Sequence, residues 1–338
     1  MSKDFIDETN YKEFDYVTYP RQFNSYRWFK PILTLILFAF FFIILGTLVT
    51  AAAALYHFLE TGGDINGFIE RFKNVTYDNM SVHDLTGCLV YFGTLAMIIP
   101  ALAMARGIVR DRSFASYSSS RGGWSHTVFF KSLIIAILVF GSITYIHTFG
   151  FHAPGPYNNQ FTKAGLIALC ILCPLQCLGE EYAFRALLTQ TLGSWTRLPI
   201  LSITLVSVGF AALHPYDRMG QIGVVASGLG LGLAAWIGHG LEVPAALHIV
   251  NNLSAFLLEG FGYQKISSST SKEEMVVTIL VNLVYVLAIL FISMKTDWFD
   301  RLKYNDAGDW NILLDDKRKR KAAKKAARKA KKEARKNR

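Results

Sequence analysis

Charged residues are scarce in this sequence of 338 residues. Asp, Glu, Lys and Arg make up only 18% of it, whereas 52% is hydrophobic, and the mean hydropathy is +0.29. A soluble domain ordinarily carries about 25% charged residues. The low charge and the long apolar runs therefore argue against a soluble fold and indicate a protein that crosses the membrane several times.

Cysteine is also rare. The four cysteines, Cys88, Cys170, Cys173 and Cys177, all lie within apolar runs, so they do not resemble an extracellular disulfide framework. Three of them recur along one helical segment, where metal ligation or redox control would need a thiolate with a strong cationic partner. We therefore expect these three to be small packing residues.

The start of the sequence lacks the short apolar core of a signal peptide. Its first 30 residues are polar and mixed in charge, so we expect the first apolar run to remain in the mature protein. Positive charge is concentrated at the other end: residues 317–338 hold fourteen Lys or Arg and one Glu, a local charge of +13. Since the whole chain carries +10, residues 1–316 carry −3.

Hydropathy predicts an all-α fold, a polytopic membrane bundle of about eight transmembrane helices. The expected spans are residues 31–59, 85–105, 133–151, 164–188, 200–213, 222–237, 243–258 and 275–292. A bilayer core of about 30 Å requires about 20 helical residues. The fifth to seventh spans are shorter, so we expect them to extend into their polar flanks or to lie inside the bundle.

Lysine and arginine indicate the orientation of these spans. With an even number of spans, both termini lie on one side of the membrane. That side would hold the tail, Arg197 and ten positive charges from the N-terminal segment and from the loop between the second and third spans: Lys3, Lys12, Arg21, Arg27, Lys30, Arg106, Arg110, Arg112, Arg121 and Lys131. The Lys and Arg residues of the loops on the opposite side are only Arg71, Lys73, Lys163, Arg218, Lys265 and Lys272. The positive-inside rule then places both termini in the cytoplasm, and we expect a bacterial plasma membrane.

The chain accordingly divides into three parts. We expect a cytoplasmic N-terminal segment at residues 1–30, a transmembrane helical domain at 31–294 and a basic cytoplasmic tail at 295–338. The tail has no wide apolar face, so it is not an amphipathic anchor. It could attract anionic lipids or RNA, or serve only as a solvated segment that reinforces topology; we expect no specific nucleic-acid binding.

Three polar motifs interrupt the apolar segments: Glu180-Glu181-x-x-x-Arg185, Phe210-x-x-x-His214 and His248-x-x-x-Asn252. Ionisable residues at hydrocarbon depth are unfavourable and usually serve a function. Residues four apart share a helix face, so Glu181 should pair with Arg185. Glu180 is rotated by about 100° and is left to point into the bundle.

The same residues could hydrolyse a bond in two ways. In the first, Glu180 and His214 activate a water molecule while His248 and Asn252 donate hydrogen bonds to the oxyanion. In the second, Glu180, His214 and His248 hold a divalent metal such as zinc, which activates the water. The sequence has no His-Glu-x-x-His pair, which weakens the second route, yet both remain open.

Taken in order, the three motifs resemble those of the CPBP intramembrane proteases, a family of CAAX prenyl endopeptidases and of bacterial relatives linked to bacteriocin processing or immunity. The resemblance covers residues 180–252. It implies an intramembrane endopeptidase that cleaves a peptide or lipid-modified peptide. It also implies that Glu180 and His214 activate water, that His248 and Asn252 form the oxyanion site, and that Glu181 and Arg185 support it.

Two other functions are compatible with the same residues. A non-enzymatic immunity or scaffold protein could bind a partner through the polar cavity, and a transporter could use buried Glu and His in a proton relay. Phe210 is expected only to pack against His214. Gly228-x-x-x-Gly232 has no strand before it, so it predicts close helix packing and not a nucleotide-binding loop.

Overall fold

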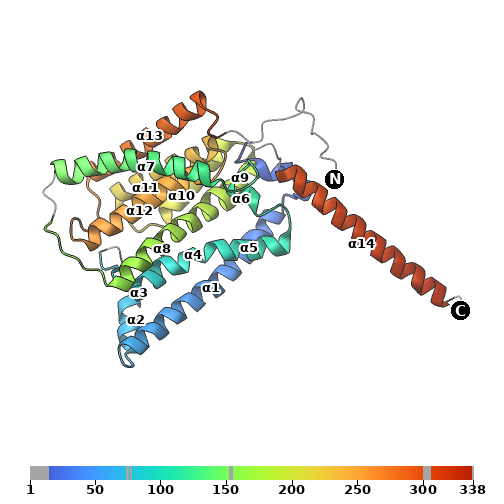
Figure 1. The fold of residues 1–338 in the computed structure, drawn as a ribbon, viewed down its shortest axis with the longest axis horizontal. Coiled ribbons are helices and arrows are strands. Elements are labelled where there is room, and N and C mark those ends of the chain that lie inside the picture. Colours follow the sequence, from blue (N-terminus) through green and yellow to red (C-terminus); the bar gives the residue numbers. More distant parts are fainter. Residues whose placement is uncertain (1–14, 74–75, 77, 152–154, 300–305, 337–338) are drawn as a thin grey trace.

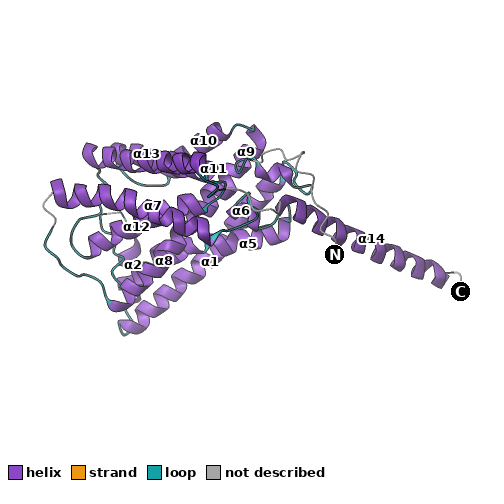
Figure 2. Ribbon diagram, turned by 45° about the horizontal axis from the view of Figure 1, so that its top comes forward, coloured by secondary structure: helices purple, strands orange, loops and turns teal. Residues whose placement is uncertain are grey.

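The structure is a computed structural model and describes residues 15–73, 76, 78–151, 155–299 and 306–336. These residues form helices and loops without a β-strand, and one isolated β-bridge joins Ser119 to Gly240. Figures 1 and 2 show a bundle of long helices from which a final helix extends away. The prediction of an all-α bundle is confirmed.

The first half of the bundle contains α1 (Lys30–Glu60), α2 (Ile65–Lys73), α3 (Leu85–Cys88), η3 (Leu89–Gly93), α4 (Thr94–Ala96), α5 (Ile98–Val109), α6 (Ala115–Ser118), α7 (His126–Tyr145) and η4 (Ile146–Phe151), preceded by η2 (Tyr19–Gln22). The second half contains α8 (Lys163–Glu181), η5 (Tyr182–Leu188), α9 (Thr189–Thr196), α10 (Pro199–Ala212), α11 (Arg218–Ile237), α12 (Glu242–Gly260), α13 (Lys272–Lys295) and α14 (Asp306–Lys336). The segments η3, η4 and η5 are π-helical and continue the α-helices before them.

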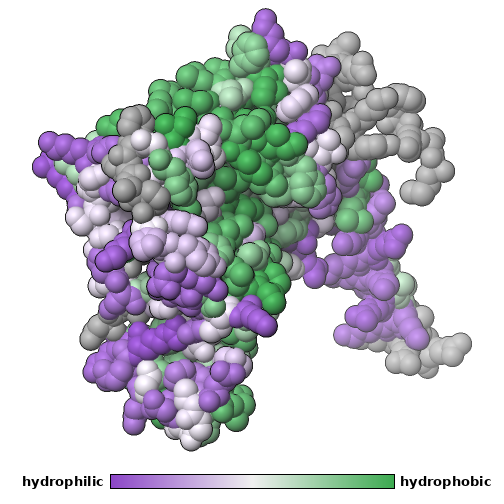
Figure 3. All heavy atoms as spheres, turned by 60° about the vertical axis from the view of Figure 1, so that its left-hand side comes forward, coloured by the Kyte–Doolittle hydropathy of each residue, from purple (hydrophilic) through white to green (hydrophobic). Residues whose placement is uncertain are grey.

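Each of the eight predicted spans corresponds to a helical segment, but they are not equally suited to crossing a bilayer. Six helices of the described residues are long and apolar enough to do so. The exceptions are α10, which has only 14 residues, and α12, whose apolar run is broken by Glu242, His248, Asn251 and Asn252. Figure 3 shows the extended hydrophobic surface that the outer helices present.

Helix α12 can carry these polar residues because it lies inside the bundle and not against lipid. It packs against α7, α8 and α11, and every residue from Glu242 to Ile249 is buried. Neighbouring helices, and not lipid, therefore surround its first two turns. The expectation that the short spans could be shielded from lipid holds for this helix.

A buried ion pair marks the point where α12 begins. Arg121 Nη2 lies 2.7 Å from Glu242 Oε2, and the backbone N–H of Ser125 donates to Glu242 Oε1 at 2.7 Å. Arg121 also donates to the carbonyl of Gly238, and Leu241 N–H donates to the carbonyl of Ser118 at 2.8 Å. The connection between α5 and α7 thus folds into the protein and holds the start of α12.

Two of the arginines counted for the orientation lie in this connection and are buried. Only 3% of Arg112 and 2% of Arg121 is exposed. Arg112 donates to the side chain of Gln190 at 2.6 Å, and its guanidinium lies 3.7 Å from the ring centre of Tyr117. Both side chains are buried because their interaction partners are buried, and a hydropathy profile does not show these partners.

The N-terminal segment and the start of α14 meet on one side of the bundle (Figure 1). Asn24 N–H donates to the Asn311 side chain at 2.7 Å, and the Trp310 indole donates to Ser25 Oγ at 3.3 Å. The Arg106 guanidinium lies 4.5 Å from the Trp310 ring centre. The N-terminal segment and the first turns of α14 therefore share one face, as an even number of passes requires; the cytoplasmic assignment of that face and the three-part division of the chain stay predictions.

Glycines bring α10 and α11 into close contact, as the sequence predicts. A Cβ atom on Gly228 would lie 2.8 Å from Ser207 Cβ and 3.0 Å from its Cα, and one on Gly232 would lie 2.6 Å from Ile203 Cγ2. The Ser207 contact includes backbone and cannot be relieved by rotating a side chain. Gly228 therefore sets the separation of the two helices.

Replacing Gly228 by Ala should lower stability by about 1–3 kcal/mol, because the extra methyl group overpacks the contact with Ser207. The matched control is Gly209→Ala in α10, where a Cβ would meet nothing within 4 Å. That control should be neutral or stabilising by up to about 1 kcal/mol, since Ala favours helix over Gly. Thermal unfolding in detergent would show this difference; equal midpoints for the two variants would contradict it.

Candidate functional site

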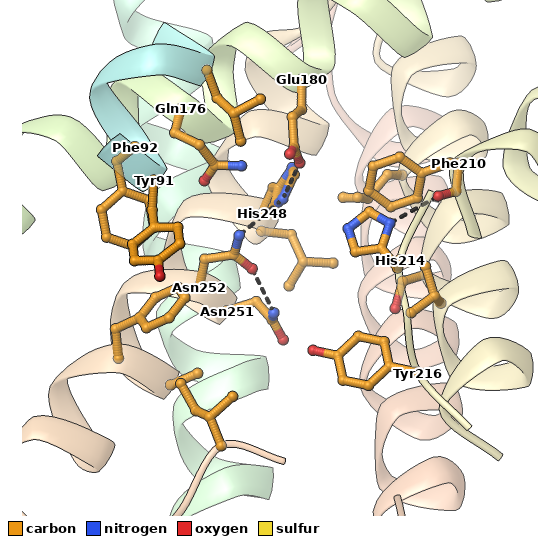
Figure 4. Close-up of a pocket in the computed structure, with 18 of the residues that line it drawn as sticks. Tyr91, Phe92, Gln176, Glu180, Phe210, His214, Tyr216, His248, Asn251 and Asn252 are labelled. Carbon is orange, nitrogen blue, oxygen red and sulfur yellow. Dashed lines mark hydrogen bonds and ion pairs between the residues drawn. The ribbon is translucent and has the colours of Figure 1, made fainter. Parts of the chain in front are cut away.

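A cavity of about 420 Å³ lies among α8, α10, α11, α12 and α13. The four residues predicted to carry the chemistry, Glu180, His214, His248 and Asn252, all line it. They come from three separate parts of the chain and face the same space (Figure 4). The fold therefore brings together residues that the sequence keeps up to 72 positions apart.

Glu181 lies behind the cavity and joins two of the three motifs. Its Oε1 accepts a hydrogen bond from Arg185 Nη1 at 3.1 Å and lies 2.7 Å from His248 Nδ1. The carboxylate is fully buried. The expected pairing with Arg185 is present, and the contact with His248 is a second role that helical spacing alone did not indicate.

Arg185 extends the same network to the second motif. Its Nη2 donates to the carbonyl of Gly228 at 3.3 Å, and the guanidinium lies 4.7 Å from the ring centre of Phe210. Phe210 also packs against His214, with ring centres 4.5 Å apart. The expectation that Phe210 packs on His214 is confirmed, and the ring also supplies a cation–π contact.

His248 presents its other ring nitrogen to the cavity. Nε2 lies 3.4 Å from Glu180 Oε2 and 3.2 Å from Asn252 Nδ2. Asn251 Nδ2 donates to Asn252 Oδ1 at 3.0 Å, which fixes the orientation of the Asn252 amide. Because Glu181 binds Nδ1, the imidazole ring is oriented so that its Nε2 lies close to both Glu180 and Asn252.

His214 faces this group from the opposite wall (Figure 4). Its Nδ1 donates to the carbonyl of Phe210 at 2.8 Å, so in the neutral ring Nε2 is the acceptor. Among the interactions of the described residues, none joins His214 directly to Glu180. A reactant or water molecule between the two walls is thus needed to connect them.

A local widening of the helix follows Glu181. Residues Tyr182–Leu188 form the π-helix η5, and such bulges within α-helices frequently lie at functional sites. Hydropathy predicts one uninterrupted span over this segment and therefore does not reveal the π-helix.

The residues present do not fit a three-ligand zinc site. Within the described part of the chain, no group of three His, Cys, Asp or Glu side chains is placed to hold a metal ion. The three candidate ligands do not share one side of the cavity, because His214 lies on the wall opposite Glu180 and His248. The cysteines do not add ligands, because none of them is among the described residues that line the cavity. The metal-dependent route is therefore not supported.

Sequence reasoning missed Gln176, which lines the cavity one turn before Glu180. Its spacing of four residues from Glu180 on one helix was a usable signal. The side chain is 4% exposed, and its amide nitrogen points toward Glu180 and His248 in Figure 4. Asn251, the neighbour of Asn252 on α12, also lines the cavity.

A polar loop borders the cavity at the end away from α14. This loop, which we call the serine strap (residues 264–271), contributes Ile266 to the lining. Ser267 Oγ donates to Asp78 Oδ1 at 2.7 Å, and Ser268 Oγ donates to Asp78 Oδ2. Thr270 N–H donates to Asp217 Oδ2 at 3.1 Å. These bonds lower the pKa of Asp78, chiefly through Ser268, and the pKa of Asp217 is lowered chiefly by the Gly220 N–H.

Replacing Asp78 by Ala should release the middle of the serine strap, because Ser267 and Ser268 lose their acceptor. Hydrogen exchange of the Ser268 amide should become faster at neutral pH, where the carboxylate of the parent protein is ionised. Asp64→Ala is the matched control, since Asp64 caps α2 by accepting from Gly67 N–H at 2.8 Å and makes no contact with the strap. Unchanged exchange at Ser268 in Asp78→Ala would contradict the prediction.

The fold and the cavity define a polytopic helical membrane protein with a polar site inside its bundle. Residues 161–254 match the family described as type II CAAX prenyl endopeptidase, Rce1-like. This segment contains all three motifs and both walls of the site, so the match supports the resemblance to the CAAX proteases over this part of the chain. The comparison with curated proteins and that with solved structures gave no match.

Proposed function

We propose that this protein is an intramembrane endopeptidase that hydrolyses a peptide bond in a membrane-associated or lipid-modified peptide. The observation that carries the proposal is the convergence of Glu180, His214, His248 and Asn252 on one cavity. A carboxylate, two imidazoles and an amide are the groups that hydrolysis of an acyl bond needs.

Glu180 and His214 activate the water. They face each other across the cavity without a direct bond, so a water molecule between them can give a proton to one while the other orients it. Attack on the peptide carbonyl then forms a tetrahedral intermediate whose oxygen carries negative charge. The protonated base returns its proton to the leaving amine.

His248 and Asn252 stabilise the intermediate. Asn252 Nδ2 and His248 Nε2 lie 3.2 Å apart on the same wall, and His248 donates from Nε2 when both ring nitrogens carry protons. Glu181 accepts from Nδ1 and so holds the ring in place, while Arg185 fixes Glu181. Glu181 and Arg185 therefore act as positioning residues.

The remaining partners of this proposal stay predictions. Helix α14 carries the basic tail as an exposed helix, which is suited to electrostatic contact with anionic lipids. We propose a bacterial plasma membrane as the setting, and the distribution of Lys and Arg favours an orientation with both termini in the cytoplasm.

Hydrolysis can be tested by the isotope that enters the product. Purified protein in detergent is incubated with a pool of hydrophobic peptides in H₂¹⁸O, and the products are analysed by mass spectrometry. A protease incorporates ¹⁸O into the new carboxyl terminus, and Glu180→Ala abolishes this product. A binding or immunity protein, or a transporter, gives no labelled product; that result, or equal cleavage by Glu180→Ala, would overturn the proposal.

A further inference from the structure

The cavity is closed at the end that faces the chain termini. Leu241, Glu242 and Val243, at the start of α12, are fully buried. Tyr285 Oη donates to the Val243 carbonyl at 2.8 Å, and α13 continues for ten residues beyond Tyr285. The buried start of α12 and the α5–α7 connection bonded to it therefore form a layer between the site and this end.

The interactions in this layer make a passage to the cavity unfavourable here. Arg121 and Glu242 form an ion pair at 2.7 Å, the Ser125 N–H donates to Glu242, and Arg121 donates to the Gly238 carbonyl. Both side chains of the pair are almost completely buried. Opening a passage here would expose or break a buried ion pair, which is strongly unfavourable.

At the opposite end, loops and not packed helices border the cavity. Thr76 and Met80 come from the connection between α2 and α3, and Tyr216 comes from that between α10 and α11. Ile266 comes from the serine strap, between α12 and α13. Asn251 lies about one turn beyond His248 toward these loops and is exposed, so the cavity is not sealed on this side of the imidazole.

The charges assign these two ends to the two sides of the membrane. The closed end carries the N-terminal segment and α14, hence the fourteen Lys or Arg of residues 317–338. The only Lys and Arg residues in the sequence of the loops at the open end are Arg71, Lys73, Lys163, Arg218, Lys265 and Lys272. By the positive-inside rule the closed end is cytoplasmic, even when the buried Arg112 and Arg121 are left out.

We propose that the site opens to the non-cytoplasmic side and takes substrates from there. The substrate class is a peptide segment already exported, or presented at the outer surface by a membrane-bound precursor, and not a peptide tail that remains in the cytoplasm. The substrate part rests on the proposed protease function, whereas the direction of opening rests only on the fold and its charges.

Cysteine labelling tests the direction of opening without any need for catalysis. Single variants Tyr216→Cys at the mouth, Asn251→Cys in the cavity and Lys325→Cys in α14 are treated with a negatively charged, membrane-impermeant thiol reagent. The protein is presented either in bacterial spheroplasts or in inverted membrane vesicles. The parent protein supplies the background, because three of its four cysteines are buried and Cys170 lies on the apolar α8 surface.

The proposal expects Tyr216→Cys and Asn251→Cys to react in spheroplasts, and Lys325→Cys to react only in inverted vesicles. Should Tyr216→Cys fail to fold, Ser269→Cys on the serine strap replaces it. Reaction of the cavity cysteines from the same side as Lys325→Cys would overturn the proposal, as would reaction of Lys325→Cys in spheroplasts.

The substrate part is tested with a quenched fluorogenic peptide taken from the pool that the purified protein cleaves. Added outside spheroplasts, it should be cleaved by the parent protein and not by Glu180→Ala. Cleavage only in inverted vesicles would overturn the proposed substrate class while leaving the protease function intact. Failure of the protease function is recognised separately, by the absence of ¹⁸O-labelled product in detergent.

Discussion

Glu180→Gln is expected to lower kcat by about 10²–10⁴-fold, the usual contribution of a positioned acid–base group. Gln has nearly the same shape as Glu and can take the same place beside His248 Nε2, which lies 3.4 Å from Glu180 Oε2, so the wall of the cavity should remain. It cannot accept the proton of the attacking water. The loss should therefore fall on kcat, while KM for the cleaved peptide changes little.

Glu70→Gln is the matched control for this experiment. Glu70 lies on α2 with a 74% exposed side chain and meets only Lys73 at 3.8 Å, a surface contact. That variant should have parental kcat, and both variants should unfold at the parental temperature. A Glu180→Gln protein that is folded and has parental kcat would show that Glu180 is not the base.

Arg121→Met is expected to destabilise the folded protein by about 3–5 kcal/mol, because it leaves the Glu242 carboxylate buried without its partner. The carboxylate is fully buried, and the Ser125 N–H would be its remaining donor. Thermal or denaturant unfolding in detergent measures the change. Activity should fall as well, since the start of α12 loses its attachment to the α5–α7 connection.

The double variant Arg121→Met/Glu242→Leu separates the buried charge from other causes. Removing both partners takes away the uncompensated charge, so this protein should be more stable than Arg121→Met alone. Arg110→Met is the matched control in the same connection; Arg110 is exposed and should tolerate the change. If the double variant is as unstable as Arg121→Met, packing and not charge explains the loss.

Much of this fold follows from local properties of the sequence. Hydropathy located all eight helical segments, because apolar length is a property of each segment alone. The pairing of Glu181 with Arg185 followed from a spacing of four residues, and the contact of α10 with α11 followed from Gly228 and Gly232. In each case the prediction depended only on the spacing of residues along one helix or on the size of a single residue.

The rest depends on segments that are distant in the chain. Arg121 and Glu242 are separated by about a third of the sequence, and Glu181 meets His248 across 67 positions. Hydropathy counts Arg121 as a loop charge because it does not record which carboxylate the fold places beside it. For the same reason, the sequence does not show how deep His248 lies in the membrane. Helix α12 begins inside the protein, and not at the membrane surface.

The position of Glu242 has a consequence for His248, six residues later on the same helix. A helix that slid by one residue would move His248 by about 1.5 Å and turn it by about 100°, away from both Glu180 and Glu181. The ion pair with Arg121 and the hydrogen bond from Ser125 therefore fix Glu242, and with it both the position of His248 along the helix axis and its rotation about that axis. The alignment of the site is set by a carboxylate that no substrate reaches.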